Sequence, residues 1–130
     1  MKSAFISKLV VVKLRGELWE VSEIFRYASR TLNMVVEVPL GFITDFASVP
    51  RLPLMYAWVG NLAQEAAVIH DYLYQKHLVG KAKADRVFLE AMKVLKISFM
   101  KRWVMYLGVV VGGWKAYASG PDRFKIFNQK

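Results

Sequence analysis

The stretch that most constrains the fold is Glu65–Tyr74, where a histidine and an aspartate follow each other inside an apolar run. It contains neither glycine nor proline. Starting just before it, apolar residues recur at intervals of four, three and four, at Leu62, Ala66, Ile69 and Leu73. This spacing is typical of one face of a helix. Burying His70 and Asp71 without partners would be costly, so the fold must supply partners or place the pair at a cleft.

Composition limits the class of protein. The chain has 130 residues, of which 55% are hydrophobic, so we expect one domain with a real core and not a disordered chain. The absence of cysteine excludes a disulfide scaffold and any thiolate metal site. We expect residues 1–50 to be mainly strand and loop, residues 54–118 to be mainly helical, and residues 119–130 to form a polar tail.

The formal charge of +9, from 19 basic and 10 acidic side chains, favours polyanionic partners. Nucleic acid, an anionic membrane surface or an acidic protein would each fit. We recognise no nucleic-acid-binding motif, and the basic clusters Lys81–Lys83 and Lys101–Arg102 resemble ordinary exposed helix faces. Nucleic acid is therefore the least favoured of these partners.

The most apolar segment is Trp103–Trp114. Its twelve residues are too few to cross a bilayer, which requires about 20. The charged residues that flank it are Lys101, Arg102 and Lys115. We therefore expect a core helix or an interfacial segment. The side chains expected to be buried against the domain or a partner chain are Val104, Leu107 and Val111.

The N-terminal region does not resemble a signal peptide, because Lys8 interrupts its short apolar run and further basic residues follow. We expect no signal peptide and no transmembrane span.

The first forty residues predict an antiparallel meander with one packed face and one wet face. The runs expected to be strands are residues 8–15, 18–21, 24–29 and 34–38. The helices expected after them are residues 62–76, 81–95 and 98–118. Glycines in the last helix allow either a close helix approach or a break before Trp114. The sequence thus predicts an α+β fold with about three helices, two of which form a His-Asp helix pair.

The segment Gly41–Pro50 is a polar loop between the two halves. Thr44, Asp45 and Ser48 are candidates to line a site, because polar side chains in an ordered loop often carry function. The alternative is that they satisfy local backbone groups.

Four side chains could form a catalytic arrangement. His70 and Tyr74 share a helix face, whereas His70 and Asp71 point about 100° apart. A neutral histidine is a natural general base if a carboxylate holds its other nitrogen, and Asp85 on the next helix could be that carboxylate. Asp71 could then hold a hard cation.

The alternative to a catalytic site is a satisfied interior histidine, with the two aspartates acting as caps or salt-bridge partners. The expected cations for such bridges are Arg51, Lys76 and Arg86.

Three motifs resemble a family of small uncharacterised domains found mainly in tailed phages and prophages. They are GFITDFASVP at residues 41–50, AAVIHDYLY at residues 66–74 and ADRVFLEAM at residues 84–92. The similarity extends from about Val38 to Gly113. It implies a phage or prophage source and a late-gene protein, such as one involved in tails or lysis. It also implies synthesis in the host cytoplasm and possible incorporation in the virion. Other phage structural proteins, or further copies of the chain, are the partners that it implies.

The motif HDYLY followed by ADRVF is also similar to the helix pair of the secreted-type phospholipase A-two group, over about Ala66–Met92. This resemblance implies that His70 activates water and that Asp71 ligates calcium. It also implies that Tyr74 bonds within the site and that Asp85 orients His70. The chain departs from that group because it lacks a clear glycine-rich calcium loop and the helix-pairing disulfides.

Two functions remain open from the sequence. The first is a phage virion, tail-associated or assembly component acting at the host-envelope stage, with a His-Asp-Asp site of unproven activity. The alternative is a metal-dependent, phospholipase-like lipid esterase with His70 as general base and calcium as cofactor.

Overall fold

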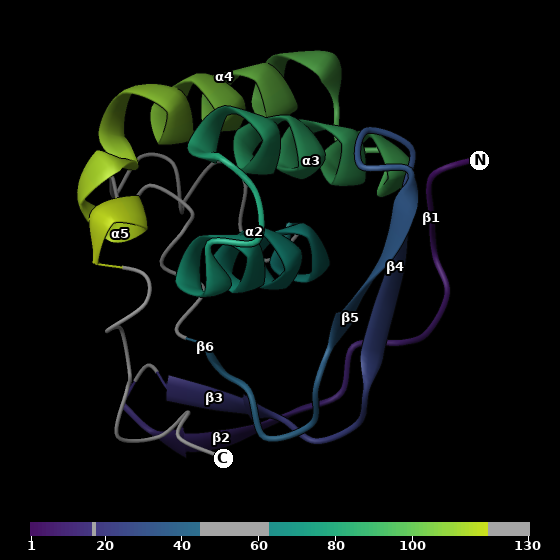
Figure 1. The fold of residues 1–130 in the computed structure, drawn as a ribbon, viewed down its shortest axis with the longest axis vertical. Coiled ribbons are helices and arrows are strands. Elements are labelled where there is room, and N and C mark those ends of the chain that lie inside the picture. The colour runs from purple at the N-terminus through teal and green to yellow at the C-terminus, as the bar shows by residue number, and fades with distance from the viewer. Residues whose placement is uncertain (17, 45–62, 120–130) are drawn as a thin grey trace.

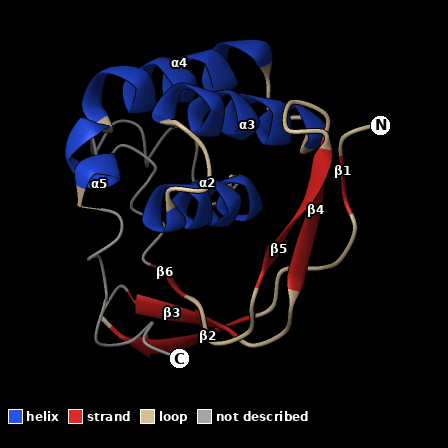
Figure 2. Ribbon diagram, viewed as in Figure 1, coloured by secondary structure: helices blue, strands red, loops and turns tan. Residues whose placement is uncertain are grey.

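Strands come first in the chain and helices follow, as the α+β prediction requires. The structure is a computed structural model that describes residues 1–16, 18–44 and 63–119. The helices pack together on one side of the molecule, and two small antiparallel sheets lie along the others (Figure 1, Figure 2).

The strands are divided between two three-stranded sheets. The first has the order β1-β4-β5, with β1 at Ala4–Phe5, β4 at Phe25–Ser29 and β5 at Met34–Val38. The second has the order β2-β3-β6, with β2 at Val11–Arg15, β3 at Leu18–Val21 and β6 at Ile43–Thr44. The predicted runs form the hairpins β2–β3 and β4–β5. The two-residue strands β1 and β6, which are too short to leave a sequence pattern, complete the sheets.

The β4–β5 hairpin shows how side-chain alternation sets the packed face. Tyr27 and Val36 are paired in the register and both are buried. On the opposite face, the neighbouring pair Arg26 and Glu37 forms an exposed ion pair with 2.8 Å between Nε and Oε2. The hairpin therefore places its apolar side toward the helices.

The helices agree closely with the predicted ranges. They are α2 at Gln64–Lys76, α3 at Lys81–Val94, α4 at Phe99–Gly112 and α5 at Trp114–Ala118. Helix α2 lies between α3 and the sheets (Figure 1) and is buried on nearly every side. A helix in this position needs apolar or fully partnered side chains all round. This requirement explains why its polar residues are the ones that form the site.

The last predicted helix breaks at Gly113, which separates α4 from α5. A Cβ atom at this position would lie 2.5 Å from the Val109 carbonyl oxygen and 2.7 Å from the Tyr74 hydroxyl. Of the two effects considered for the glycines, the break of the helix occurs here, and it is the Tyr74 hydroxyl of α2, not the backbone of that helix, that lies close to Gly113.

Three side chains of α4 were expected to be buried, and two of them are exposed in this chain. Leu107 is 53% exposed and Val111 is 78% exposed, whereas Val104 is partly buried. The side chains that pack inward are Met105 and Val109. Helix α4 carries apolar side chains on two of its faces, and only one of these faces packs against α3.

In the described part of the chain, no helix combines the length and apolar character that crossing a membrane requires.

We expect Gly113→Ala to destabilise the protein by about 1–3 kcal/mol, because the added methyl group would overlap the Val109 carbonyl oxygen and the Tyr74 hydroxyl. Gly112→Ala is the matched control, since a Cβ there meets nothing within 4 Å. The control should be neutral or slightly stabilising, because alanine favours helix more than glycine does. Urea unfolding of both variants measures the difference, and equal stability would contradict the close contact.

Candidate functional site

The carboxylate of Asp85 is the centre of the predicted site, and three side chains converge on it. His70 Nε2 lies 2.7 Å from Oδ1, the Tyr74 hydroxyl donates to the same oxygen at 2.5 Å, and Lys81 Nζ donates to Oδ2 at 2.8 Å. Since an ionised carboxylate only accepts hydrogen bonds, Nε2 of His70 carries the proton in this contact. We call these four residues the Asp85 network.

Helical spacing produces the Asp85 network. His70 and Tyr74 are four residues apart on α2, and Lys81 and Asp85 are four residues apart on α3. The turn between the helices begins at His77, which has a left-handed backbone with φ of 48°. A left-handed residue commonly ends a helix and reverses the chain. The short turn then sets the two pairs side by side.

Lys81 extends the Asp85 network to a third helix. Its Nζ also donates to the carbonyl oxygens of Val109 at 2.8 Å and Val110 at 3.1 Å. These carbonyls belong to the last turn of α4, where the negative end of the helix dipole attracts cations. The carbonyl oxygen of Val109 also accepts a hydrogen bond from the Gly113 amide at 2.8 Å. One ammonium group therefore joins α3 to the end of α4.

Two predictions about the cations are wrong. Lys81 is not on an ordinary exposed helix face, because only 6% of it is exposed. It is also Lys81, and not the expected Lys76 or Arg86, that neutralises Asp85. Lys76 and Arg86 are exposed, and Arg51 lies outside the described residues. The signal available in the sequence was the four-residue spacing between Lys81 and Asp85.

The electrostatics favour an ionised Asp85. Burial alone would raise the pKa of this carboxyl, but the hydrogen bonds from His70, Lys81 and Tyr74 outweigh burial and hold the pKa below its usual value. Burial, followed by the hydrogen bond to Asp85, raises the pKa of Tyr74. Tyr74 therefore remains a hydroxyl donor at any physiological pH.

The Asp85 network is enclosed. His70 and Tyr74 are 0% exposed and Asp85 is 1% exposed. The His70 ring packs against Tyr74 and Phe88 in tilted arrangements, with centroid distances of 4.0 and 4.8 Å. The surroundings are those of an interior histidine with aromatic neighbours.

Asp71 belongs to a different group, on the other side of α2. Its Oδ2 accepts hydrogen bonds from the Thr44 hydroxyl at 2.6 Å and the Gln75 amide at 3.2 Å. Gln75 also donates to the carbonyl oxygen of Ile43 at 3.3 Å. These contacts tie α2 to β6, and the predicted divergence of His70 and Asp71 explains why the two residues serve different neighbours.

The residues described around Asp71 do not fit a calcium site. Thr44 and Gln75 present hydrogen-bond donors to the carboxylate, whereas calcium requires a shell of oxygen ligands. Within residues 1–16, 18–44 and 63–119, no three acidic or histidine side chains gather as metal ligands would. The candidate residues Asp45 and Ser48 lie outside the described residues.

Sequence reasoning missed a further carboxylate contact, at the partly buried Glu90 on α3. Glu90 Oε1 accepts from the Tyr27 hydroxyl at 2.7 Å, and Oε2 accepts from the Thr31 hydroxyl at 2.6 Å and its backbone amide at 2.8 Å. Burial raises the pKa of Glu90, but the bonds from Thr31 and Tyr27 outweigh it and lower the pKa. This contact fixes α3 on the β4–β5 hairpin.

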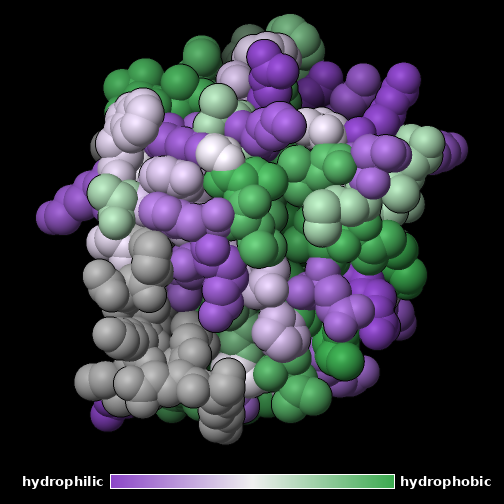
Figure 3. Space-filling view, viewed as in Figure 1, coloured by the Kyte–Doolittle hydropathy of each residue, from purple (hydrophilic) through white to green (hydrophobic). Residues whose placement is uncertain are grey.

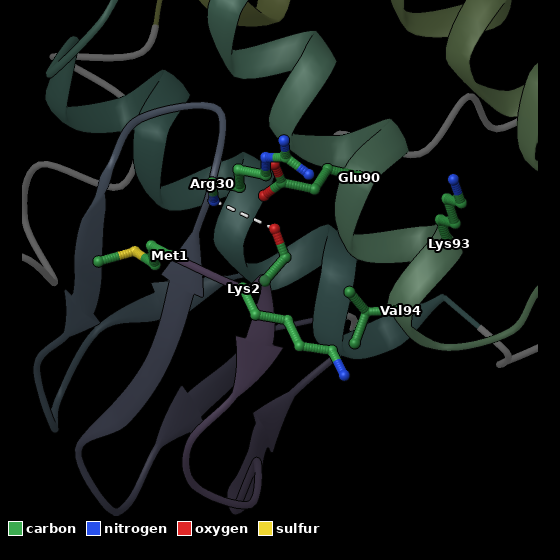
Figure 4. A pocket seen from close by; sticks show the side chains of 7 residues that line it. Met1, Lys2, Arg30, Glu90, Lys93 and Val94 are labelled. Atoms are coloured by element: carbon green, nitrogen blue, oxygen red, sulfur yellow. Dashed lines mark hydrogen bonds between the residues drawn. The ribbon is translucent and has the colours of Figure 1, made fainter.

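Two open hollows lie on the described surface, and neither is lined by the Asp85 network. The first, of about 490 Å³, lies beside the N-terminus and is lined by Lys2, Arg30, Glu90 and Lys93 among others, with the Lys2 and Lys93 side chains extending away from Glu90 (Figure 4). The second, of about 450 Å³, lies between the N-terminal strands and the start of α2. The oxygens of Glu90 are already occupied by Tyr27 and Thr31, so the first hollow offers no unused carboxylate.

Comparison with known proteins gives a family match. A family model described as "Protein of unknown function (DUF1353)" matches residues 19–109, which include α2, α3 and most of the β strands. Searches of the curated proteins and of the solved structures found no match.

We expect Asp85→Asn to destabilise the protein by about 3–5 kcal/mol at neutral pH, because it leaves the Lys81 ammonium buried without its counter-charge. The exposed Glu23→Gln is the matched control and should have little effect. Because the pKa of Asp85 is lowered on folding, the stabilisation is complete above the unfolded-state pKa of about 4. It is lost as the pH falls through the lower folded-state pKa.

Urea unfolding of wild type and Asp85→Asn between neutral and acid pH measures this difference. The difference in unfolding free energy between the two proteins should become smaller only below about pH 4. A difference that is small and independent of pH would show that Asp85 is not an ionised partner of Lys81.

Proposed function

The chain belongs to the DUF1353 family, whose function is not known, and from the Asp85 network we propose a non-catalytic role. The protein is a phage or prophage late-gene component, virion- or tail-associated or an assembly factor, that acts at the host-envelope stage. The observation that carries the non-catalytic role is the enclosed Asp85, with both oxygens occupied and a lysine as counter-charge. The phage assignment rests on the resemblance of the motifs in residues 41–50, 66–74 and 84–92.

The chemistry of a general base explains why Lys81 matters. A carboxylate assists a catalytic histidine by stabilising the imidazolium that forms when the ring takes a proton. The Lys81 ammonium, 2.8 Å from the same carboxylate, already compensates that negative charge. Asp85 would therefore stabilise a protonated His70 much less than an unpaired carboxylate would. The network is better suited to holding three helices than to moving protons.

A hydrolase remains the second candidate, because the contacts of His70 and Tyr74 with Asp85 are those that the phospholipase resemblance implies. In that role Nδ1 of His70 would accept the proton, since Nε2 faces Asp85. We derive no calcium-dependent step, because the described surroundings of Asp71 do not fit calcium. The proposed partners are other phage structural proteins or further copies of the chain.

We expect His70→Asn to lower stability by about 1–3 kcal/mol, because it removes one donor from a buried carboxylate. His77→Asn is the comparison at the chain's other histidine, which is exposed but stacks on Tyr117 and contacts its carbonyl oxygen. It should cost less stability than His70→Asn, because exposed contacts contribute less and asparagine tolerates a left-handed backbone. His70→Gln should lose less stability than His70→Asn, since its longer amide can still donate toward Asp85. Thermal and urea unfolding measure all three.

The same proteins should be assayed for lipid-ester hydrolysis, with and without calcium. The proposal predicts no hydrolysis by wild type and a clear stability loss in His70→Asn. Hydrolysis by wild type that disappears in both His70 variants, with stability unchanged, would establish the hydrolase instead.

A further inference from the structure

The outward face of α4 is apolar along the length of the helix. Its exposed side chains are Phe99, Met100, Trp103, Leu107 and Val111. Trp103, Leu107 and Val111 follow one another at intervals of four residues, which places them on one side of the helix. The opposite side, with Met105 and Val109, packs on the domain. We call the five exposed residues the α4 face.

The α4 face lies at an outer edge of the molecule. Helix α4 is the outermost layer, with α3 between it and α2 (Figure 1), and apolar patches lie along the same edge, among hydrophilic side chains, in the space-filling view (Figure 3). Single exposed apolar residues are ordinary, but a contiguous apolar ridge on one helix marks a docking surface.

The charged residues in the part of the sequence that contains α4 are all basic. No acidic residue occurs between Glu90 and Asp122. The basic residues in this interval are Lys93, Lys96, Lys101, Arg102 and Lys115. Lys101 and Arg102 belong to the first turn of α4 and are partly buried, and Arg102 donates to the carbonyl oxygen of Ile97 at 3.1 Å. An apolar ridge is therefore accompanied by cations without compensating acids nearby in the sequence.

We propose that the α4 face docks the protein on an anionic lipid surface, with α4 lying in the plane of the membrane. A helix that presents apolar and aromatic side chains, with lysine and arginine beside them, gains from burial in the acyl region and from anionic headgroups together. Aromatic side chains such as Trp103 favour the boundary between these two regions.

A second copy of the chain fits the α4 face less well. Two copies that joined through this face would bring the cations of both helices together, and like charges at an interface oppose association. A lipid surface offers the opposite charge and also deforms around a convex ridge. The lipid surface would be that of the host envelope, so the docking site rests on the proposed action at the envelope. It does not depend on the role of His70.

The test is binding of the whole chain to vesicles of phosphatidylcholine with phosphatidylglycerol, compared with vesicles of phosphatidylcholine alone. Wild type should cosediment with the anionic vesicles, more weakly at high salt, and the tryptophan emission should shift to the blue. In the variant Leu107→Gln/Val111→Gln, the partition coefficient should fall by about tenfold or more, because two side chains buried in the interface become polar. Both side chains are exposed, so the fold should tolerate the change.

The matched control is Ile6→Gln/Val12→Gln, which makes the same kind of change at two apolar residues that are also about half exposed, in the strand region. It should bind as wild type does. Absence of wild-type binding, or equal binding by the α4 variant, would overturn the proposal. So would a wild-type dimer in light scattering that becomes a monomer in the α4 variant, since the α4 face would then be a contact between copies.

Discussion

The helical half of the molecule depends on one buried carboxylate. Asp85 accepts from His70 and Tyr74 on α2 and from Lys81 on its own helix, and Lys81 in turn binds the last carbonyls of α4. A buried ion costs several kcal/mol unless its partners are well placed, so the arrangement of the helices and the ionisation of Asp85 support each other. Removing either charge leaves the other unpaired inside the protein. This mutual requirement explains why polar side chains occur in the middle of the most buried helix.

The family match leaves function to be argued from the site, and the site contains features of both candidates. The contacts of His70 and Tyr74 with Asp85 have the pattern that a histidine general base would need. The ammonium of Lys81 on the same carboxylate, and the enclosure of the ring, favour a structural role. Asp71 strengthens this view, because it binds Thr44 and Gln75 as a carboxylate does when it joins a helix to a strand.

Much of the fold and part of the site could be predicted from the sequence. Periodicity located α2 and α3, and the expectation that His70, Tyr74 and Asp85 lie together is confirmed. Asp71, which was expected in the same site, binds Thr44 and Gln75 instead. The burial of Lys81 could not be predicted, because a lysine four residues from an aspartate is usually an exposed helix pair. The exposure of Leu107 and Val111 was missed for the reverse reason: apolar residues are expected inside, and only the packing of α4 on α3 decides which face remains outside. The strands β1 and β6 are too short for any periodic signal.

The claim that Lys81 and Asp85 stabilise the fold as a pair is tested most directly by a double-mutant cycle. The free energy of unfolding should be measured for wild type, Lys81→Met, Asp85→Asn and the double variant. The account predicts a coupling energy of about 1–3 kcal/mol, with the double variant more stable than Asp85→Asn alone, because methionine removes the unpaired ammonium. Losses that simply add would contradict a shared buried charge pair and would mean that the two residues stabilise the helices independently.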